Sequence, residues 1–242
     1  MIKVGTCGFT TKHFNYFDVL EVQQTFYDFV GEKSLKNWGS LAREKNVELT
    51  IKANQIITHP FNVATYKRMR HKIGNQENYG NFRLTKEVEE AWEITAEEAR
   101  KLNAKVIVFQ SPSSFKPTEE NIQNLFNFFT SIRSNEFILA WEPRGEEWYS
   151  PKGKEVIKRL VEELGIIHVV DPFRHETLSE GIVYYRLHGI GKGEVNYRYK
   201  YTDQDLKTLA SKVNKENNKI TYVLFNNIYS FEDALRFKSL VK

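Results

Sequence analysis

The sequence predicts an α/β fold in which eight parallel strands close into a barrel. Eight short runs rich in β-branched residues alternate along the chain with longer segments of helical spacing. This alternation is typical of a parallel sheet, and eight is the number of strands that closes into a TIM-type barrel. The sequence contains no internal repeat, low-complexity tract or linker. We therefore predict a TIM-type (β/α)8 barrel that occupies residues 1–242 as a single domain.

Local patterns place the elements in order. Strands are expected at residues 2–7, 18–24, 48–53, 105–110, 137–142, 167–171, 182–188 and 220–226. Apolar stripes of helical spacing, or N-terminal cap patterns, predict helices over residues 88–102, 122–132 and 151–164 and from residues 202 and 230 onward. Helices after the first and sixth strands are expected to be short or missing. Residues 54–85 form the longest irregular stretch, and loops of this length are usually functional or mobile.

Composition and local motifs exclude several classes of protein. The 14% aromatic content argues against disorder, and no apolar run approaches the roughly 18 residues of a membrane span. The chain enters a strand pattern at once, so we expect no signal peptide. Cys7 has no partner for an internal disulfide, which favours the cytoplasm. Residues 5–9 lack the G-x-G-x-x-G turn of the alternative fold, a doubly wound open sheet.

Polar side chains end most of the predicted strands, and TIM-type barrels place catalytic groups at the carboxyl ends of their strands. The second strand is expected to end in four residues of one parity, Glu21, Gln23, Thr25 and Tyr27. The other strand ends supply Lys52, Gln110, Glu142, Arg144, Arg186, His188, Asn226 and Asn227. These groups follow positions expected to face the barrel interior, namely Val19, Val108, Ala140, Tyr184 and Leu224. Because buried charge is costly unless it is paired or used, we expect a functional pocket at this end.

The same residues carry a family resemblance. The motifs, in chain order, are Gly5-Thr6-Cys7-Gly8-Phe9, residues 21–27, Lys52-Ala53, Thr58-His59, residues 110–115, Glu142-Pro143-Arg144 with Trp148, residues 185–189 and Phe225-Asn226-Asn227. Together they resemble the YecE-like family, also known as domain of unknown function 72. The resemblance spans nearly the whole chain and implies a TIM-type barrel, but it implies no activity. The sequence departs from the family pattern at Cys7, Gln23 and Pro143, where serine, Asp or Asn, and an aromatic residue are usual.

The charges at the strand ends favour an anionic ligand, most simply one that contains phosphate. Lys52, Arg144 and Arg186 outnumber Glu21 and Glu142 by one charge, and the whole chain carries a net charge of +4. We expect Arg186 to supply most of the affinity, because its planar fork holds two oxygens and the neighbouring Gly189 permits close backbone approach. His59 and His188 could add positive charge. The alternative is internal pairing, such as Glu142 with Arg144 or Glu21 with Arg186.

Catalytic and metal-binding alternatives use the same groups. His188 is the best candidate for a general acid or base, because the ordinary pKa of histidine lies near neutrality. Glu21 and Glu142 could act as the carboxylate pair of a sugar-acting glycosidase or isomerase, with Trp141 and Trp148 stacking on the sugar. A divalent metal could bind Glu21, Glu142, Asp171 and His188, although no metal-ligand motif is present. Cys7 is either a nucleophile or a small buried residue.

Two basic segments suggest a different class of partner. Residues 196–201 interleave tyrosines with Arg198 and Lys200, and residues 67–72 are rich in basic side chains. Such surfaces bind nucleic acid through phosphates and base stacking, whereas the alternative is a tyrosine-rich loop packed on the barrel rim. The best-supported expectation is a small anionic, phosphate-containing ligand, with phosphoester hydrolysis as a candidate reaction. The residues expected to bind it are Tyr27, Lys52, His59, Gln110, Arg144, Trp148, Arg186, Asn226 and Asn227.

Overall fold

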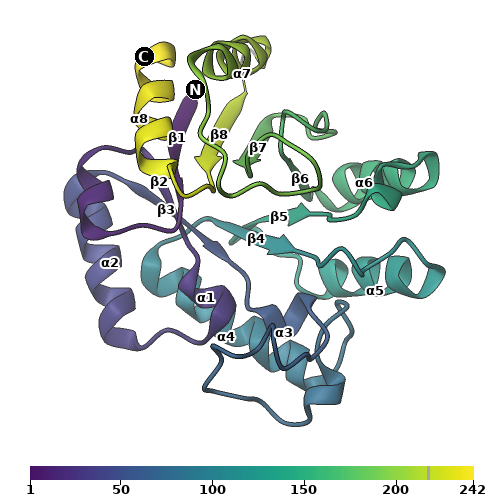
Figure 1. The fold of residues 1–242 in the computed structure, drawn as a ribbon. Coiled ribbons are helices and arrows are strands. Elements are labelled where there is room, and N and C mark those ends of the chain that lie inside the picture. The colour runs from purple at the N-terminus through teal and green to yellow at the C-terminus, as the bar shows by residue number, and fades with distance from the viewer. Residues whose placement is uncertain (217–218) are drawn as a thin grey trace.

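The computed structural model describes residues 1–216 and 219–242, and its eight strands form a closed parallel barrel (Figure 1). Each strand pairs with its neighbours in chain order, and β1 pairs with β8 to close the ring. The strands are β1 (Ile2–Cys7), β2 (Val19–Val22), β3 (Glu48–Lys52), β4 (Val106–Gln110), β5 (Ile138–Glu142), β6 (Ile167–Val170), β7 (Ile182–Leu187) and β8 (Ile220–Phe225). The predicted fold class is confirmed, and each strand begins and ends within two residues of its expected bounds.

Helices surround the barrel on its outer face (Figure 1). They are α1 (Gln24–Tyr27), α2 (Glu32–Lys45), α3 (Gln55–Thr58), α4 (Lys86–Leu102), α5 (Glu119–Ser131), α6 (Pro151–Leu164), α7 (Asp203–Lys215) and α8 (Ser230–Val241). The N-caps of α4, α5, α6 and α7 are serine or threonine side chains that accept a backbone N–H of the first turn. As expected, β1 is followed only by the short 3-10 helix η1 (Thr11–Asn15), and the described connection from β6 to β7 contains no helix.

The hydrophobic core has two layers, which lie on opposite faces of the sheet. One cluster fills the barrel interior and includes all five positions predicted to point there: Val19, Val108, Ala140, Tyr184 and Leu224. A larger cluster lies between the sheet and the helices, where residues of alternate parity such as Ile107, Phe109 and Trp141 pack against the helices. Because side chains two apart on a strand face the same side, the residue two positions after each interior residue also faces inward and lies nearer the mouth of the barrel.

The end of β2 differs from the prediction. The strand stops at Val22, and residues 24–27 form the single helical turn α1. The Thr25 hydroxyl donates to carbonyl oxygens of both Val22 and Lys52, at 3.1 and 2.6 Å, which fastens this turn to the neighbouring strand. Thr25 and Tyr27 therefore do not share the strand parity of Glu21, and Tyr27 reaches the mouth of the barrel from a helical turn instead.

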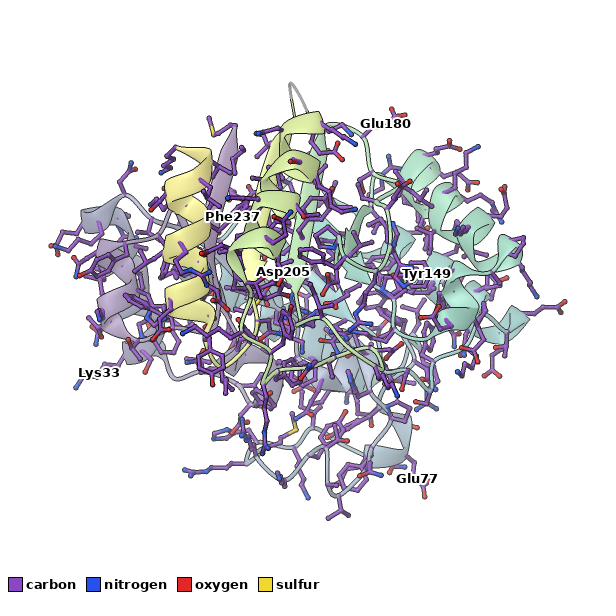
Figure 2. The ribbon with its side chains drawn as sticks, turned by 45° about the horizontal axis from the view of Figure 1, so that its top comes forward. Lys33, Glu77, Tyr149, Glu180, Asp205 and Phe237 are labelled. Carbon is purple, nitrogen blue, oxygen red and sulfur yellow. The ribbon has the colours of Figure 1, made fainter. Side chains whose placement is uncertain are left out.

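The long segment after β3 packs against the carboxyl end of the barrel. It contains α3 and the 3-10 helix η2 (Gln76–Asn78), and its buried side chains include Tyr66, Met69 and Tyr79. The Tyr66 hydroxyl donates to the carbonyl oxygens of Gln55 and His59 and ties the segment to α3. In Figure 2, Glu77 of this segment and Glu180, just before β7, lie at opposite ends of the molecule. Among the described residues, no helix has the length and apolar character needed to cross a bilayer.

Candidate functional site

Arg186 lies at the centre of a polar layer near the carboxyl end of the barrel. Its guanidinium is 0% exposed and donates to Glu21 Oε1 at 2.8 Å, to Glu142 and, more weakly, to Gln110 Oε1 at 3.3 Å. Glu21 also accepts the Tyr184 hydroxyl at 2.8 Å from the interior layer below. One buried cation therefore holds two buried carboxylates, which is an arrangement that offsets the cost of removing each charge from water.

Glu142 connects this centre to a second cation and to the histidine of β7. Its Oε1 lies 2.7 Å from Arg144 Nη2 and 2.8 Å from His188 Nε2. The other ring nitrogen, His188 Nδ1, lies 3.1 Å from the Asn226 amide nitrogen. Arg144 Nη2 also lies 2.8 Å from His188 Nε2, so this ring nitrogen has both a guanidinium donor and a carboxylate acceptor as neighbours.

Burial sets the protonation of this network. Burial alone would raise the pKa of Glu142, but Arg144 and Arg186 hold it well below its usual range, so the carboxylate is ionised. Burial is the main cause that lowers the pKa of His188 to about 3. Arg144 acts in the same direction, and Glu142 acts in the opposite direction. His188 is therefore neutral near pH 7, and its role as a general acid or base stays a prediction.

Lys52 reaches an open hollow at the mouth of the barrel. The hollow has a volume of about 320 Å³ and is lined by Gln23, Tyr27, Lys52, Gln110, Tyr197, Asn226, Asn227 and Ile228. Lys52 is 5% exposed, its Nζ donates to Gln110 Oε1 at 3.0 Å, and it lies 3.7 Å from the centre of the Phe26 ring. No carboxylate of the described residues lies within 4.0 Å of Lys52 Nζ, in contrast to Arg144 and Arg186.

The electrostatic surroundings of Lys52 disfavour its ammonium form. Burial is the main cause that lowers the pKa of Lys52 to about 7, with Arg186 and Arg144 acting in the same direction and Glu142 and Glu21 in the opposite direction. Near pH 7 a substantial fraction of Lys52 is therefore a neutral amine. A buried lysine of this kind can serve as a base, as a nucleophile or as a cation that gains charge when an anion arrives.

The predicted role of Arg186 as the main ligand contact is not supported by its position. Both ends of its planar fork are bound to glutamates, which is the internal pairing that the sequence left open. Gly189, which was expected to permit close approach of a ligand, is required at its position for a different reason. Gly189 has a φ of +85°, and a Cβ there would lie 2.1 Å from the Asn196 carbonyl oxygen. The close approach at Gly189 comes from the protein's own loop.

Three other predicted binding residues lie outside the hollow or support it. Trp148 is fully buried, donates to the Phe115 carbonyl oxygen at 2.6 Å and packs edge-on against Trp141, so neither indole is available to stack on a sugar. His59 packs edge-on against Phe26, on which Lys52 also lies. Asn227 lines the hollow and also supports it, because its amide nitrogen donates to the Tyr199 carbonyl oxygen and to Asp233. Burial lowers the pKa of His59 to about 3, so His59 adds no charge.

The four residues suggested for a metal do not fit one. The oxygens of Glu21 and Glu142 accept from arginine, tyrosine and histidine donors, and Asp171 accepts the backbone N–H of His188 at 2.9 Å. Within residues 1–216 and 219–242, no group of three His, Cys, Asp or Glu side chains converges as metal ligands would. The same contacts weigh against a glycosidase pair, because an ionised Glu142 bound to two arginines is a poor general acid.

Cys7 belongs to the polar layer as a hydrogen-bond partner. Its Sγ lies 3.4 Å from Arg186 Nε. Burial raises the pKa of the Cys7 thiol well above its usual range, and Glu21 adds to this effect. A thiol that stays protonated is a weak nucleophile, so the structure favours the interpretation of Cys7 as a small packed residue.

Each of the two basic segments has a side chain in the lining of the hollow or in contact with it. In residues 67–72, the guanidinium of Arg68 lies 4.6 Å from the centre of the Tyr27 ring. In residues 196–201, Tyr201 is buried and its hydroxyl accepts the Gly189 N–H at 2.8 Å, as expected of a rim anchor. Tyr197 is 45% exposed and lies edge-on to His188, with 6.1 Å between ring centres. Tyr27 and Tyr197 thus line the hollow together with Lys52, and Arg68 covers the Tyr27 ring.

Comparison with known families decides the relationship that these motifs suggested. Residues 10–242 match the family described as protein of unknown function DUF72. The chain belongs to the DUF72 family. A DUF72 protein of Enterococcus faecalis V583 has 20% identity and a TM-score of 0.78, and the match covers 100% of this chain and 97% of that one. A DUF72 protein of Thermotoga maritima MSB8 has 24% identity and a TM-score of 0.71 over 100% and 99% of the two chains.

More distant matches show that other TIM-type barrels share the fold of this DUF72 chain. D-psicose 3-epimerase, solved in the presence of D-fructose, has a TM-score of 0.54 and 9% identity over 94% of this chain and 84% of that one. No curated protein sequence matches the chain. Because all these identities lie below 25%, the solved structures establish the barrel fold, and function has to be argued from the site itself.

Sequence reasoning missed two residues that shape the site of this DUF72 protein. Phe26 supports Lys52, but it lies on the helical turn α1, which the sequence analysis took for a continuation of β2. Ile228 is 65% exposed beside Asn226 and Asn227, and it forms an apolar part of the wall of the hollow. The residues Asn226-Asn227-Ile228 directly follow β8, so their position after the strand was the available signal for Ile228.

Proposed function

We propose that the mouth of the barrel binds a small anionic ligand, most simply one that contains phosphate, with Lys52 as its cation. The observation that carries this proposal is the position of Lys52. It lines the hollow and, among the described residues, has no carboxylate within ion-pair distance. A cation in this position gains the partner that it lacks when an anion enters.

The charges beneath the hollow support the proposal. Glu21 and Glu142 are matched by Arg186 and Arg144, and His188 is neutral because burial lowers its pKa to about 3. Protonated Lys52 is then the surplus charge of the layer. An anion beside Lys52 would favour the ammonium form, so ligand binding and protonation of Lys52 would be coupled.

The rest of the hollow suits a small polar molecule. Gln23, Gln110 and Asn226 offer amide groups, and Tyr27 and Tyr197 offer hydroxyls and flat ring faces. A volume of about 320 Å³ lies at the lower end of the range for small-molecule sites. A phosphate ester of a small polyol or sugar matches this combination. Phosphoester hydrolysis is the reaction to test first, with release of phosphate from small phosphomonoesters as the assay.

Titration with sulfate tests the proposal, because sulfate keeps the same charge across the relevant pH range. We expect binding by isothermal calorimetry at pH 6 and a loss of at least about tenfold in affinity for Lys52→Gln, since one charge-assisted hydrogen bond contributes roughly 1.5–3 kcal/mol. Affinity should fall above pH 7 as Lys52 loses its proton. Lys105→Gln removes the same charge from an exposed position before β4 and is the control. Equal affinity of wild type and Lys52→Gln contradicts the proposal.

A second candidate is binding of a nucleic-acid strand across the rim. The observation that favours it is the half-exposed ring of Tyr197 in the lining of the hollow, together with Arg68 of the basic segment 67–72, which covers Tyr27 in the same lining. This candidate predicts oligonucleotide binding that weakens steeply with salt and with the double change Lys67→Gln and Arg70→Gln. Sulfate binding that is unaffected by the double change, without oligonucleotide binding, favours the small-ligand proposal.

A further inference from the structure

We propose that Lys52 is a covalent nucleophile, which forms an imine with a small aldehyde or ketone that carries an anionic group. This inference rests on the proposed function, because both place the ligand in the hollow at Lys52. It goes further by naming a carbonyl group as the chemical feature that Lys52 recognises. The carbonyl carbon would bond to Nζ, and the anionic group would face the positive charge that the imine nitrogen retains.

The geometry of Lys52 fits this role. It extends from the last residue of β3 into the hollow, and the Phe26 ring and the Gln110 side chain hold its Nζ from two sides. Low exposure at 5% keeps Nζ out of bulk water while the hollow gives a ligand access. In contrast, Lys3, at the other end of the barrel, forms an ion pair with Glu48.

The charge around Lys52 supports the neutral amine that this chemistry requires. Burial lowers the pKa of Lys52 to about 7, and the neighbouring arginines act in the same direction. The charged and titratable groups that act on Lys52 or line its hollow are Glu21, Tyr27, His59, Glu142, Arg144, Arg186 and Tyr197. At pH 7 about half of Lys52 would be the amine, against well under about 0.1% for a lysine of ordinary pKa. Desolvated lysines of this kind form imines with carbonyl compounds in enzymes.

The step balances without a further reactant. The Nζ lone pair forms a bond to the carbonyl carbon, and a proton moves from nitrogen to the former carbonyl oxygen to give a carbinolamine. That hydroxyl takes one more proton, which enters from solvent through the open mouth, and leaves as water while the carbon–nitrogen double bond forms. The protonated imine keeps a single positive charge, which the face of the Phe26 ring and the Gln110 oxygen are placed to stabilise.

Reductive trapping tests this inference. The protein is incubated at pH 7 with glyceraldehyde 3-phosphate and sodium cyanoborohydride, and the reduced adducts are located by peptide mass spectrometry. We expect one dominant adduct, on Lys52, formed at least about tenfold faster than the adduct on any other lysine. Uncharged glyceraldehyde should react more slowly. Lys52→Arg should lose the dominant adduct, whereas Lys3→Arg, the matched control at the opposite end of the barrel, should keep it.

Two further readouts keep the test decisive. Excess sulfate should protect Lys52 in the wild-type protein, which does not depend on how the Lys52→Arg variant folds. Adducts spread evenly over exposed lysines, in wild type and in Lys52→Arg alike, overturn the inference. Sulfate binding without trapping at Lys52 refutes the imine and leaves the anion site standing, whereas trapping at Lys52 without sulfate binding supports the imine and refutes the anion site.

Discussion

Replacement of Lys52 by methionine measures how strongly the barrel disfavours a charge at this position. Methionine has a similar length and carries no charge, so the hollow keeps its shape. Burial lowers the pKa of Lys52 from 10.5 to about 7. At about 1.4 kcal/mol per pH unit, this difference corresponds to about 5 kcal/mol against the protonated folded chain. Methionine also loses the hydrogen bond to Gln110 and the contact of the ammonium with Phe26, so we expect a net gain of about 2–4 kcal/mol at pH 6.

The gain should depend on pH in a defined direction. Below pH 7 Lys52 is protonated in both the folded and unfolded wild-type chains, and the full cost is present. Between pH 7 and 10.5 the folded chain binds fewer protons at Lys52 than the unfolded chain, so the stability of wild type rises with pH relative to Lys52→Met. The advantage of Lys52→Met should therefore shrink by about 3 kcal/mol between pH 6 and 9.5.

Urea unfolding at pH 6 and pH 9.5 measures the stability gain of Lys52→Met at pH 6 and the decrease of that gain at pH 9.5. Lys105→Met is the control, because Lys105 is exposed before β4 and should show no such difference between the two pH values. If Lys52→Met is less stable than wild type by the same amount at both pH values, the reasoning about Lys52 is refuted. That result would mean that Lys52 stabilises the fold as an ordinary ammonium.

Two further predictions concern the supports of the site. Arg186→Met leaves two buried carboxylates without their shared cation, so urea unfolding should show a loss of about 3–5 kcal/mol, and unchanged stability would contradict the central role of Arg186. Gly189→Ala places a Cβ against the Asn196 carbonyl oxygen and should lower the melting temperature and expose the following loop to proteolysis. Gly181→Ala also has a positive φ but meets no atom within 4 Å, so an equal effect at both positions would refute the steric argument.

The sequence was sufficient to predict the barrel and the content of its polar layer. Strand alternation carries one parity from Val108 to Gln110 and from Tyr184 to Arg186, and the structure has the first member of each pair in the barrel interior and the second in the polar layer. This prediction works because side chains two apart on a strand face the same side, whatever helices cover the barrel.

The sequence could not determine which charges pair and which stay available. Arg186 and Lys52 both end strands, but Arg186 is long enough to bridge Glu21 and Glu142 across the barrel, whereas Lys52 meets an aromatic ring and an amide. That difference depends on distances across the barrel, which no local pattern records. In the structure Lys52 lines the hollow, whereas both ends of the Arg186 fork are bound to glutamates.

The predictions for residues 24–27 and for Trp148 were wrong because they were made from the local sequence pattern alone. Residues 24–27 alternate like a strand, but tertiary hydrogen bonds of Thr25 hold them as a helical turn. Trp148 follows a strand end as a ligand-stacking residue would, but its indole fills a core position next to Trp141 and Phe115. In both cases tertiary contacts override the local signal, which is where reasoning from sequence alone is weakest.

The most direct test of the account is the pKa of Lys52 itself. Competitive acetylation with a trace of acetic anhydride, read out lysine by lysine with mass spectrometry over a pH series, reports the reactivity of each amine. We predict a midpoint of about 7 for Lys52, well below the value of about 10.4 that is ordinary for lysine. Addition of sulfate should move the Lys52 midpoint upward. A Lys52 midpoint near 10, unaffected by sulfate, would contradict both the anion site and the proposed imine.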